Sequence, residues 1–199
     1  MNLRRSLRRD LGDGKTITIT RDYEVEFTAL GSGYSLSGRQ VSVEIDAPPS
    51  LARFAGFEFD RDDSAAYPVN LGVSGVLMDA RQIDDSISLA RAVAEALDVI
   101  ADAGLPVDDQ AQARAYISVL AQSAATANAA SPPDLFVPPA SANRRQDTIS
   151  LPGGLKGTIA VEFSGNRAAA SGLMTSAKRL IITELSGSRR TSEEHWILG

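Results

Sequence analysis

Apolar and polar residues alternate along residues 16–28 of the chain. Ile17, Ile19 and other apolar or aromatic residues occupy one parity, while threonine, aspartate and glutamate occupy the other. A period of two with β-branched and aromatic residues is typical of a half-buried antiparallel strand. Arg21 interrupts the apolar positions, so we expect a bend or an exposed end there.

A second alternating run follows a glycine-rich turn and changes parity across Gly38. Its apolar positions are even up to Leu36 and odd from Val41 onward. A strand cannot change faces without an irregularity, so the sequence predicts a β-bulge or a second turn. We interpret residues 15–46 as a long, strongly bent hairpin and residues 67–78 as a short second hairpin.

A third alternating region lies near the C-terminal end of the chain. Gly165 and Asn166 predict a turn between two of its runs. In the last run Trp196 shares the parity of Glu194, so we expect the inward face of that run to begin only near its end. Residues 157–198 are predicted to form an antiparallel meander.

The middle of the chain, residues 83–129, is rich in alanine and has no strand-like alternation. Polar residues in its first half form one narrow stripe at helical spacing, which indicates that other parts of the protein cover most of that helix. Gly104 and Pro106 separate this half from a second helical pattern, as expected at a helix end. We predict an αα-hairpin.

A proline-rich connector follows over residues 130–150. Four of the eight residues from 132 to 139 are proline, which excludes a helix there and favours an extended chain. The apolar residues Leu135, Phe136 and Val137 lie between the proline pairs. We expect these three residues to dock onto the core.

The order of strands, helices and strands predicts an α+β fold in a single domain, residues 1–199. Strands of residues 15–80 and 151–199 would form one curved, mostly antiparallel sheet packed on the central αα-hairpin, because neither flank could bury its apolar face alone. This layout loosely resembles the half-barrel lipoprotein carriers, in which helices plug an open barrel. The resemblance is one of layout and includes no shared motif.

Composition and charge exclude several functional classes. The chain has 199 residues, no cysteine, one histidine and a net charge of −5. Disulfides, thiolate metal sites and thiol nucleophiles are therefore excluded, and a nucleic-acid partner is not expected for a mildly acidic chain. No apolar run reaches the roughly 18 residues of a membrane-spanning helix.

The first nine residues contain four arginines and lead into polar residues without an apolar stretch, so we do not expect them to act as a signal peptide. We interpret them as a solvated end segment. As written, the chain is expected in the cytoplasm, and the alternative is an exported protein from which a signal peptide was removed.

No motif identifies a catalytic residue, a metal ligand or a cofactor site. His195 lies between Glu194 and Trp196 near a strand end, where a solvated side chain is the expectation. The acidic run of residues 58–63 fails as a calcium loop, because in a loop that starts at Asp60 the positions that require glycine and glutamate hold Ala65 and Leu71. The glycine-rich turns match neither a dinucleotide-binding nor a phosphate-binding fingerprint.

Three functional hypotheses stay open at this point. The first is a non-catalytic binding or carrier domain for an unknown, apolar or amphipathic ligand held between sheet and helices. A cavity of at least about 300 Å³ would support it. The candidate ligand-contacting residues are Tyr23, Phe27, Tyr34, Leu97, Phe163 and Trp196.

The second hypothesis is a protein-interaction or assembly module that uses an exposed sheet edge or the prolines of residues 132–139. The third is a hydrolase that uses carboxylates such as Asp60, Asp62 and Glu194, and it is the least favoured. The partner and the oligomeric state stay unknown.

Overall fold

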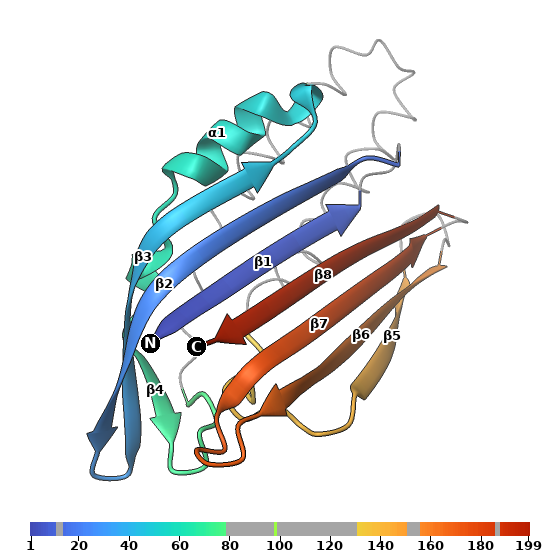
Figure 1. Ribbon diagram of the computed structural model, residues 1–199. Coiled ribbons are helices and arrows are strands. Elements are labelled where there is room, and N and C mark those ends of the chain that lie inside the picture. Colours follow the sequence, from blue (N-terminus) through green and yellow to red (C-terminus); the bar gives the residue numbers. More distant parts are fainter. Residues whose placement is uncertain (11–13, 79–97, 99–130, 151–155, 186–187) are drawn as a thin grey trace.

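A computed structural model of the chain describes residues 1–10, 14–78, 98, 131–150, 156–185 and 188–199. Strands account for 62% of the described residues and helices for 11%. Eight strands form one antiparallel sheet, curled into a half-barrel, in the order β4-β3-β2-β1-β8-β7-β6-β5 (Figure 1). The strands are β1 (Asn2–Asp10), β2 (Thr16–Leu30), β3 (Gly33–Asp46), β4 (Val69–Gly72), β5 (Asn143–Ser150), β6 (Lys156–Arg167), β7 (Met174–Leu185) and β8 (Ser188–Leu198).

Both ends of the chain meet in the middle of this sheet. Strand β1 pairs with β8 so that Leu3 lies opposite Leu198, and the backbones of Asn2 and Gly199 exchange two hydrogen bonds of 2.7 and 3.0 Å. A single sheet built from both ends of the chain was predicted and is confirmed. The interpretation of residues 1–9 as a solvated end segment is wrong, because they form a central strand.

The α+β fold class with a central helical hairpin is also wrong. The described part of the chain is nearly all sheet, and its one α-helix, α1 (Ala52–Asp60), lies along the β3 edge (Figure 1). The hairpin predicted over 83–129 lies outside the described residues, as does Leu97. Alanine-rich composition predicts helices but does not show what they pack against, and in the described part of the chain loops between the strands pack on one face of the sheet.

The register of the first hairpin explains its change of parity. Strands β2 and β3 pair along almost their whole length, and a bulge at Asp22 and Tyr23 leaves Val41 as the extra residue on β3. This confirms the long hairpin and the predicted bulge. Arg21 does not lie at an exposed end, because its side chain is only 4% exposed, and the irregularity of the strand follows directly after it at Asp22 and Tyr23.

The remaining strand predictions are largely confirmed. The short hairpin pairs Leu71 with Leu77, and β6, β7 and β8 form the meander. The turn predicted at Gly165 and Asn166 is wrong, since β6 continues to Arg167. The connector ends early because Asn143–Ser150 forms strand β5.

Two loops cover one end of the inner face, the face of the sheet that bears Leu3, Tyr23 and Trp196. The first is the short 3-10 helix η2 (Asp63–Ala66) with Tyr67, which packs on β3. The second, which we call the proline-rich segment, comprises residues 131–139. Another 3-10 helix, η1 (Pro49–Leu51), precedes α1 away from this core.

The proline-rich segment runs from the β4 hairpin to the β6–β7 hairpin. Leu77 N donates to Pro133 O at 2.7 Å, Met174 N donates to Phe136 O at 2.9 Å, and Arg167 Nε donates to Pro138 O at 2.7 Å. Leu135 and Phe136 are 3% and 2% exposed in the core cluster, which confirms that this apolar stretch docks. The segment therefore ties together two parts of the sheet that are distant in strand order.

Candidate functional site

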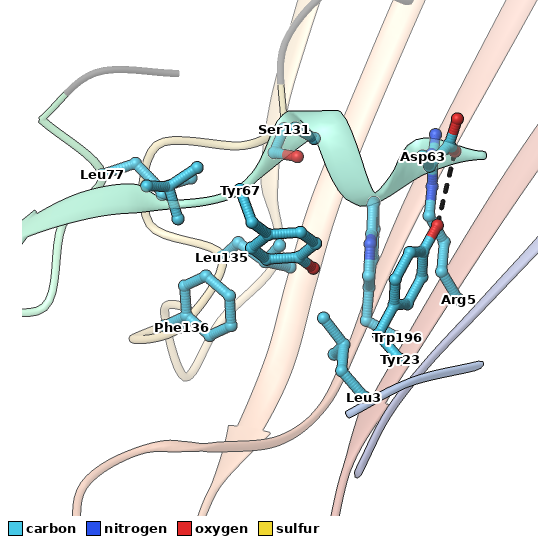
Figure 2. Close-up of a pocket in the computed structure, with 12 residues that line it drawn as sticks. Leu3, Arg5, Tyr23, Asp63, Tyr67, Leu77, Ser131, Leu135, Phe136 and Trp196 are labelled. Carbon is cyan, nitrogen blue, oxygen red and sulfur yellow. Dashed lines mark hydrogen bonds and ion pairs between the residues drawn. The ribbon is translucent and has the colours of Figure 1, made fainter. Parts of the chain in front are cut away.

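A small pocket lies on the inner face under these two loops. Its volume is about 80 Å³, and it is partly open. Most of its wall is hydrocarbon or aromatic, whereas Arg5 and Asp63 form one polar end (Figure 2). The residues that line it are Leu3, Arg5, Tyr23, Asp63, Ala66, Tyr67, Val69, Leu77, Ser131, Leu135, Phe136 and Trp196.

Strand periodicity and loop packing bring these residues together. Leu3 and Arg5 are two apart on β1, so both point to the inner face, and Trp196 lies directly opposite Arg5 on β8. The ring of Tyr67 lies against Gly38, where an added Cβ would come within 2.8 Å of three ring carbons. Glycine at position 38 therefore allows the aromatic ring to approach the backbone of β3 closely.

A buried ion-pair network borders the pocket and is centred on Glu194, which is 4% exposed. Arg5 Nη2 donates to Glu194 Oε1 at 2.6 Å, and Arg179 binds the other carboxylate oxygen. Burial alone would raise the pKa of Glu194, but the two guanidinium groups outweigh it and lower that pKa. Burial likewise opposes the charge of Arg5, yet the carboxylate of Glu194 raises the pKa of Arg5 above its ordinary value. Both groups therefore stay charged at neutral pH.

Asp63 is the second buried carboxylate of the network, with 2% exposure. Arg61 Nε donates to its Oδ1 at 2.7 Å, and Arg21 Nε lies 3.4 Å from its Oδ2. The hydroxyl of Tyr23 donates to the same Oδ2 at 3.4 Å (Figure 2). Arg21 in turn binds the Glu58 carboxylate at 2.9 Å, which links the network to α1.

Both tyrosine hydroxyls at the pocket are protonated at neutral pH. Burial raises the pKa of Tyr67 to about 12. Burial and the negative charge of Asp63 raise the pKa of Tyr23 as well. Each hydroxyl can therefore donate a hydrogen bond, and neither can serve as a base at neutral pH.

The structure places the predicted ligand-contacting residues in different surroundings. Tyr23 and Trp196 line the pocket. Phe27 and Phe163 lie behind it in edge-to-face contacts, Phe27 with Phe136 at 5.6 Å between ring centroids and Phe163 with Trp196 at 6.5 Å. Tyr34 is 43% exposed and does not line the pocket.

The polar residues of the pocket were missed at the level of sequence. Arg5 lies in a run of arginines that suggested solvent, and Asp63 lies in an acidic run without a ligand motif. Leu3, Arg5 and Leu7 occupy alternate positions, which is the pattern of a strand with one buried face. The arginine in the middle of this pattern makes the strand hard to recognise from the sequence.

The carboxylates of the hydrolase hypothesis do not converge. Asp60 and Asp62 are exposed, whereas Glu194 is buried and bound by arginines. His195 is exposed, with Nε2 3.6 Å from Glu193 Oε1. Among the described residues, no group of three or more histidine, aspartate or glutamate side chains could hold a metal ion. None of the described helices is long and apolar enough to cross a membrane.

No protein-family model, curated protein or solved structure matches the chain. The functional argument therefore starts from the pocket itself.

Proposed function

We propose that this protein is a non-catalytic binding domain for a small molecule that is partly apolar and partly polar. The observation that carries the proposal is the pocket at Trp196, whose walls are mostly aromatic and aliphatic and whose charged residues, Arg5 and Asp63, lie at one end. Ligand sites typically combine a mostly apolar lining with a few polar groups that orient the ligand.

The volume restricts the ligand. An apolar cavity of about 150 Å³ accommodates benzene, and typical ligand pockets measure about 300–1,000 Å³. The pocket of about 80 Å³ is below both sizes and does not reach the roughly 300 Å³ that would support a carrier. It suits a molecule of a few heavy atoms, or one end of a larger molecule that leaves through the open side. We therefore do not propose a carrier that encloses a whole lipid chain.

The buried carboxylates support binding over catalysis. A general base works best with a pKa near the operating pH. Glu194 has a pKa below its ordinary value, and Arg5 and Arg179 occupy its oxygens. A network of this kind can orient a ligand, but Glu194 is a poor proton acceptor at neutral pH.

Titration with small fragments tests the proposal directly. Trp196 is the only tryptophan, so its indole N–H gives a single, assignable NMR signal at the pocket wall. We expect small uncharged fragments with an apolar body and one polar group to shift this signal saturably.

A matched pair of variants provides the control. Ala66 lines the pocket, and Ala65 is its exposed neighbour in the same 3-10 helix. Ala66→Leu fills the pocket and should abolish the shift, whereas Ala65→Leu should preserve it. Equal responses in the two variants, or no fragment response in the native protein, would contradict the proposal.

A protein-interaction module is the second candidate, favoured by an exposed apolar group at one end of the sheet. Leu30, Tyr34 and Val73 are 51%, 43% and 79% exposed, and the pairing of Gly33 with Gly72 brings their turns together. Native mass spectrometry distinguishes the two candidates. A small bound mass on the monomer favours the ligand, and concentration-dependent oligomers that Leu30→Ser removes favour the interaction module.

A further inference from the structure

The polar end of the pocket presents one positive and one negative group side by side. Arg5 Nη1 lies 4.0 Å from Asp63 Oδ2, beyond hydrogen-bond distance, and both residues line the pocket. The other two side-chain nitrogens of Arg5 both donate to Glu194, Nε at 3.2 Å and Nη2 at 2.6 Å. Nη1 forms no hydrogen bond to a described residue, so its N–H groups can serve a ligand.

Asp63 also retains capacity to accept. Its Oδ1 receives the short bond from Arg61, whereas the contacts of its Oδ2 with Tyr23 and Arg21 are both 3.4 Å long. A carboxylate oxygen can accept two hydrogen bonds, and Oδ2 accepts one from a described residue, Tyr23, since its contact with Arg21 is an ion pair only. A ligand N–H or O–H placed in the pocket could therefore bind Oδ2.

A third polar group faces the same space. The hydroxyl of Tyr67 makes no hydrogen bond within the described part of the chain, and Figure 2 shows it pointing into the space between the labelled side chains. It adds a second donor beside the N–H groups of Arg5. The polar end thus offers two donors and one acceptor to the same ligand head.

A charged ligand head gains little at this place. The two opposite charges lie 4.0 Å apart, and each is already paired, Arg5 with Glu194 and Asp63 with Arg61, so neither charge needs an ion as its partner. A neutral head with both an acceptor and a donor can bind both residues and also replaces the lost hydrogen bonds to water.

We infer that the pocket selects small neutral molecules of the carboxamide class over carboxylates and amidinium ions of the same shape. In this arrangement the amide oxygen accepts from Arg5 and Tyr67, and the amide N–H donates to Asp63, while a short alkyl group lies against Leu3 and Trp196. The inference rests on the proposed function, since it requires the pocket to be a ligand site.

Three probes of the same heavy-atom skeleton test this selectivity: propionamide, propionate and propionamidine, which is a cation at neutral pH. Each is titrated into the labelled native protein at pH 7 and constant ionic strength, with the indole N–H of Trp196 as the readout. We expect propionamide to bind at least ten times more tightly than either ion. Equal or tighter binding of propionate or propionamidine overturns the inference.

The possible failures can be told apart. If other uncharged fragments shift the Trp196 signal but propionamide has no advantage over its ions, the ligand class is wrong and the binding pocket stands. If no fragment of any class shifts the signal, both proposals fail.

A pair of aspartate variants identifies the source of the selectivity. Asp63→Asn keeps the side-chain shape and removes the negative charge, so the preference for propionamide over propionate should fall at least threefold. Asp62→Asn, at the exposed N-cap of η2, should leave the preference unchanged, since asparagine also caps helices well. An unchanged preference in folded Asp63→Asn contradicts the assigned role of Asp63, and the three-probe series on the native protein decides the inference if that variant does not fold.

Discussion

The two faces of the central strands use the same residue types for different purposes. Arg4 and Arg5 are neighbours on β1. Arg4 points outward to an exposed ion pair with Asp22 at 2.7 Å, and Arg5 points inward to Glu194 and the pocket. On β8, Glu193 pairs outward with Lys178 at 2.8 Å, while Glu194 lies buried between two arginines.

The difference shows why counting charged residues misjudges this sheet. Exposed pairs gain little because water screens them, whereas a buried charge without its partner carries an uncompensated desolvation cost. Outer ion pairs therefore add little to stability, and the inner network controls both folding and the polar end of the pocket. Substitutions of neighbouring residues on opposite faces separate these roles.

The largest effect is expected at Glu194. Glu194→Gln keeps the side-chain size but removes the carboxylate that binds both Arg5 and Arg179. Breaking this buried ion pair should lower the free energy of unfolding by about 3–5 kcal/mol. Glu193→Gln, on the outer face, should cost less than about 1 kcal/mol. Urea denaturation of the two variants measures the difference, and equal losses would contradict the contrast between the faces.

Apolar neighbours on β8 should show the same contrast. Leu198 is 6% exposed in the core cluster, and Ile197 is 52% exposed. We expect Leu198→Ala to destabilise by about 2–4 kcal/mol, because it leaves a cavity. Ile197→Ala should cost less than about 1 kcal/mol. Denaturation midpoints at constant m-value report both numbers, and a larger loss at Ile197 would reverse our assignment of the faces.

A glycine substitution tests the loop that covers the pocket. Gly38→Ala would bring a Cβ within 2.8 Å of the Tyr67 ring, and the forced shift should cost about 1–3 kcal/mol and alter the Trp196 signal. Gly56 in α1 has no atom within 4 Å of such a Cβ, so Gly56→Ala should stabilise by about 0.5–1 kcal/mol. Stabilisation by Gly38→Ala would show that Tyr67 does not pack as described.

The smallest effect concerns pH. The folded-state pKa of Glu194 is below its ordinary value of 4.5, so its stabilisation is fully present above that value and is lost as pH falls toward the folded pKa. The stability difference between the native protein and Glu194→Gln should therefore be constant near neutral pH and shrink below about pH 4.5. A difference that grows on acidification would contradict the sign of the shift.

Strands in which apolar and polar residues alternate regularly could be predicted from the sequence. The alternation of β2, the parity change near Gly38 and the meander of residues 157–198 follow directly from the pleat, which has a period of two. The central strand β1 was missed because arginines occupy both of its faces, and only burial distinguishes Arg5 from Arg4. Asp63 and Tyr67 enter the site from a loop whose position depends on long-range packing against Gly38.

Of the candidate ligand residues, the two that line the pocket, Tyr23 and Trp196, lie on regular strands. Aromatic residues on the inward parity of a strand lie in the core or line its cavities. Tyr34 is also an aromatic residue on a predicted inward parity. It lies near the exposed turn between β2 and β3, where a residue on the inward side of a strand can still be exposed to solvent. The predicted α+β class is wrong because the composition of residues 83–129 indicates local helix propensity and does not determine which segments pack on the sheet.

The central claim is that the inner face holds an open pocket beside its buried ion pairs. A crystal structure of the native protein soaked with propionamide tests it most directly. The account predicts electron density for the molecule between Trp196 and Tyr67, with its amide against Arg5 and Asp63. A pocket filled by the protein's own side chains, with the molecule bound elsewhere or absent, would contradict it.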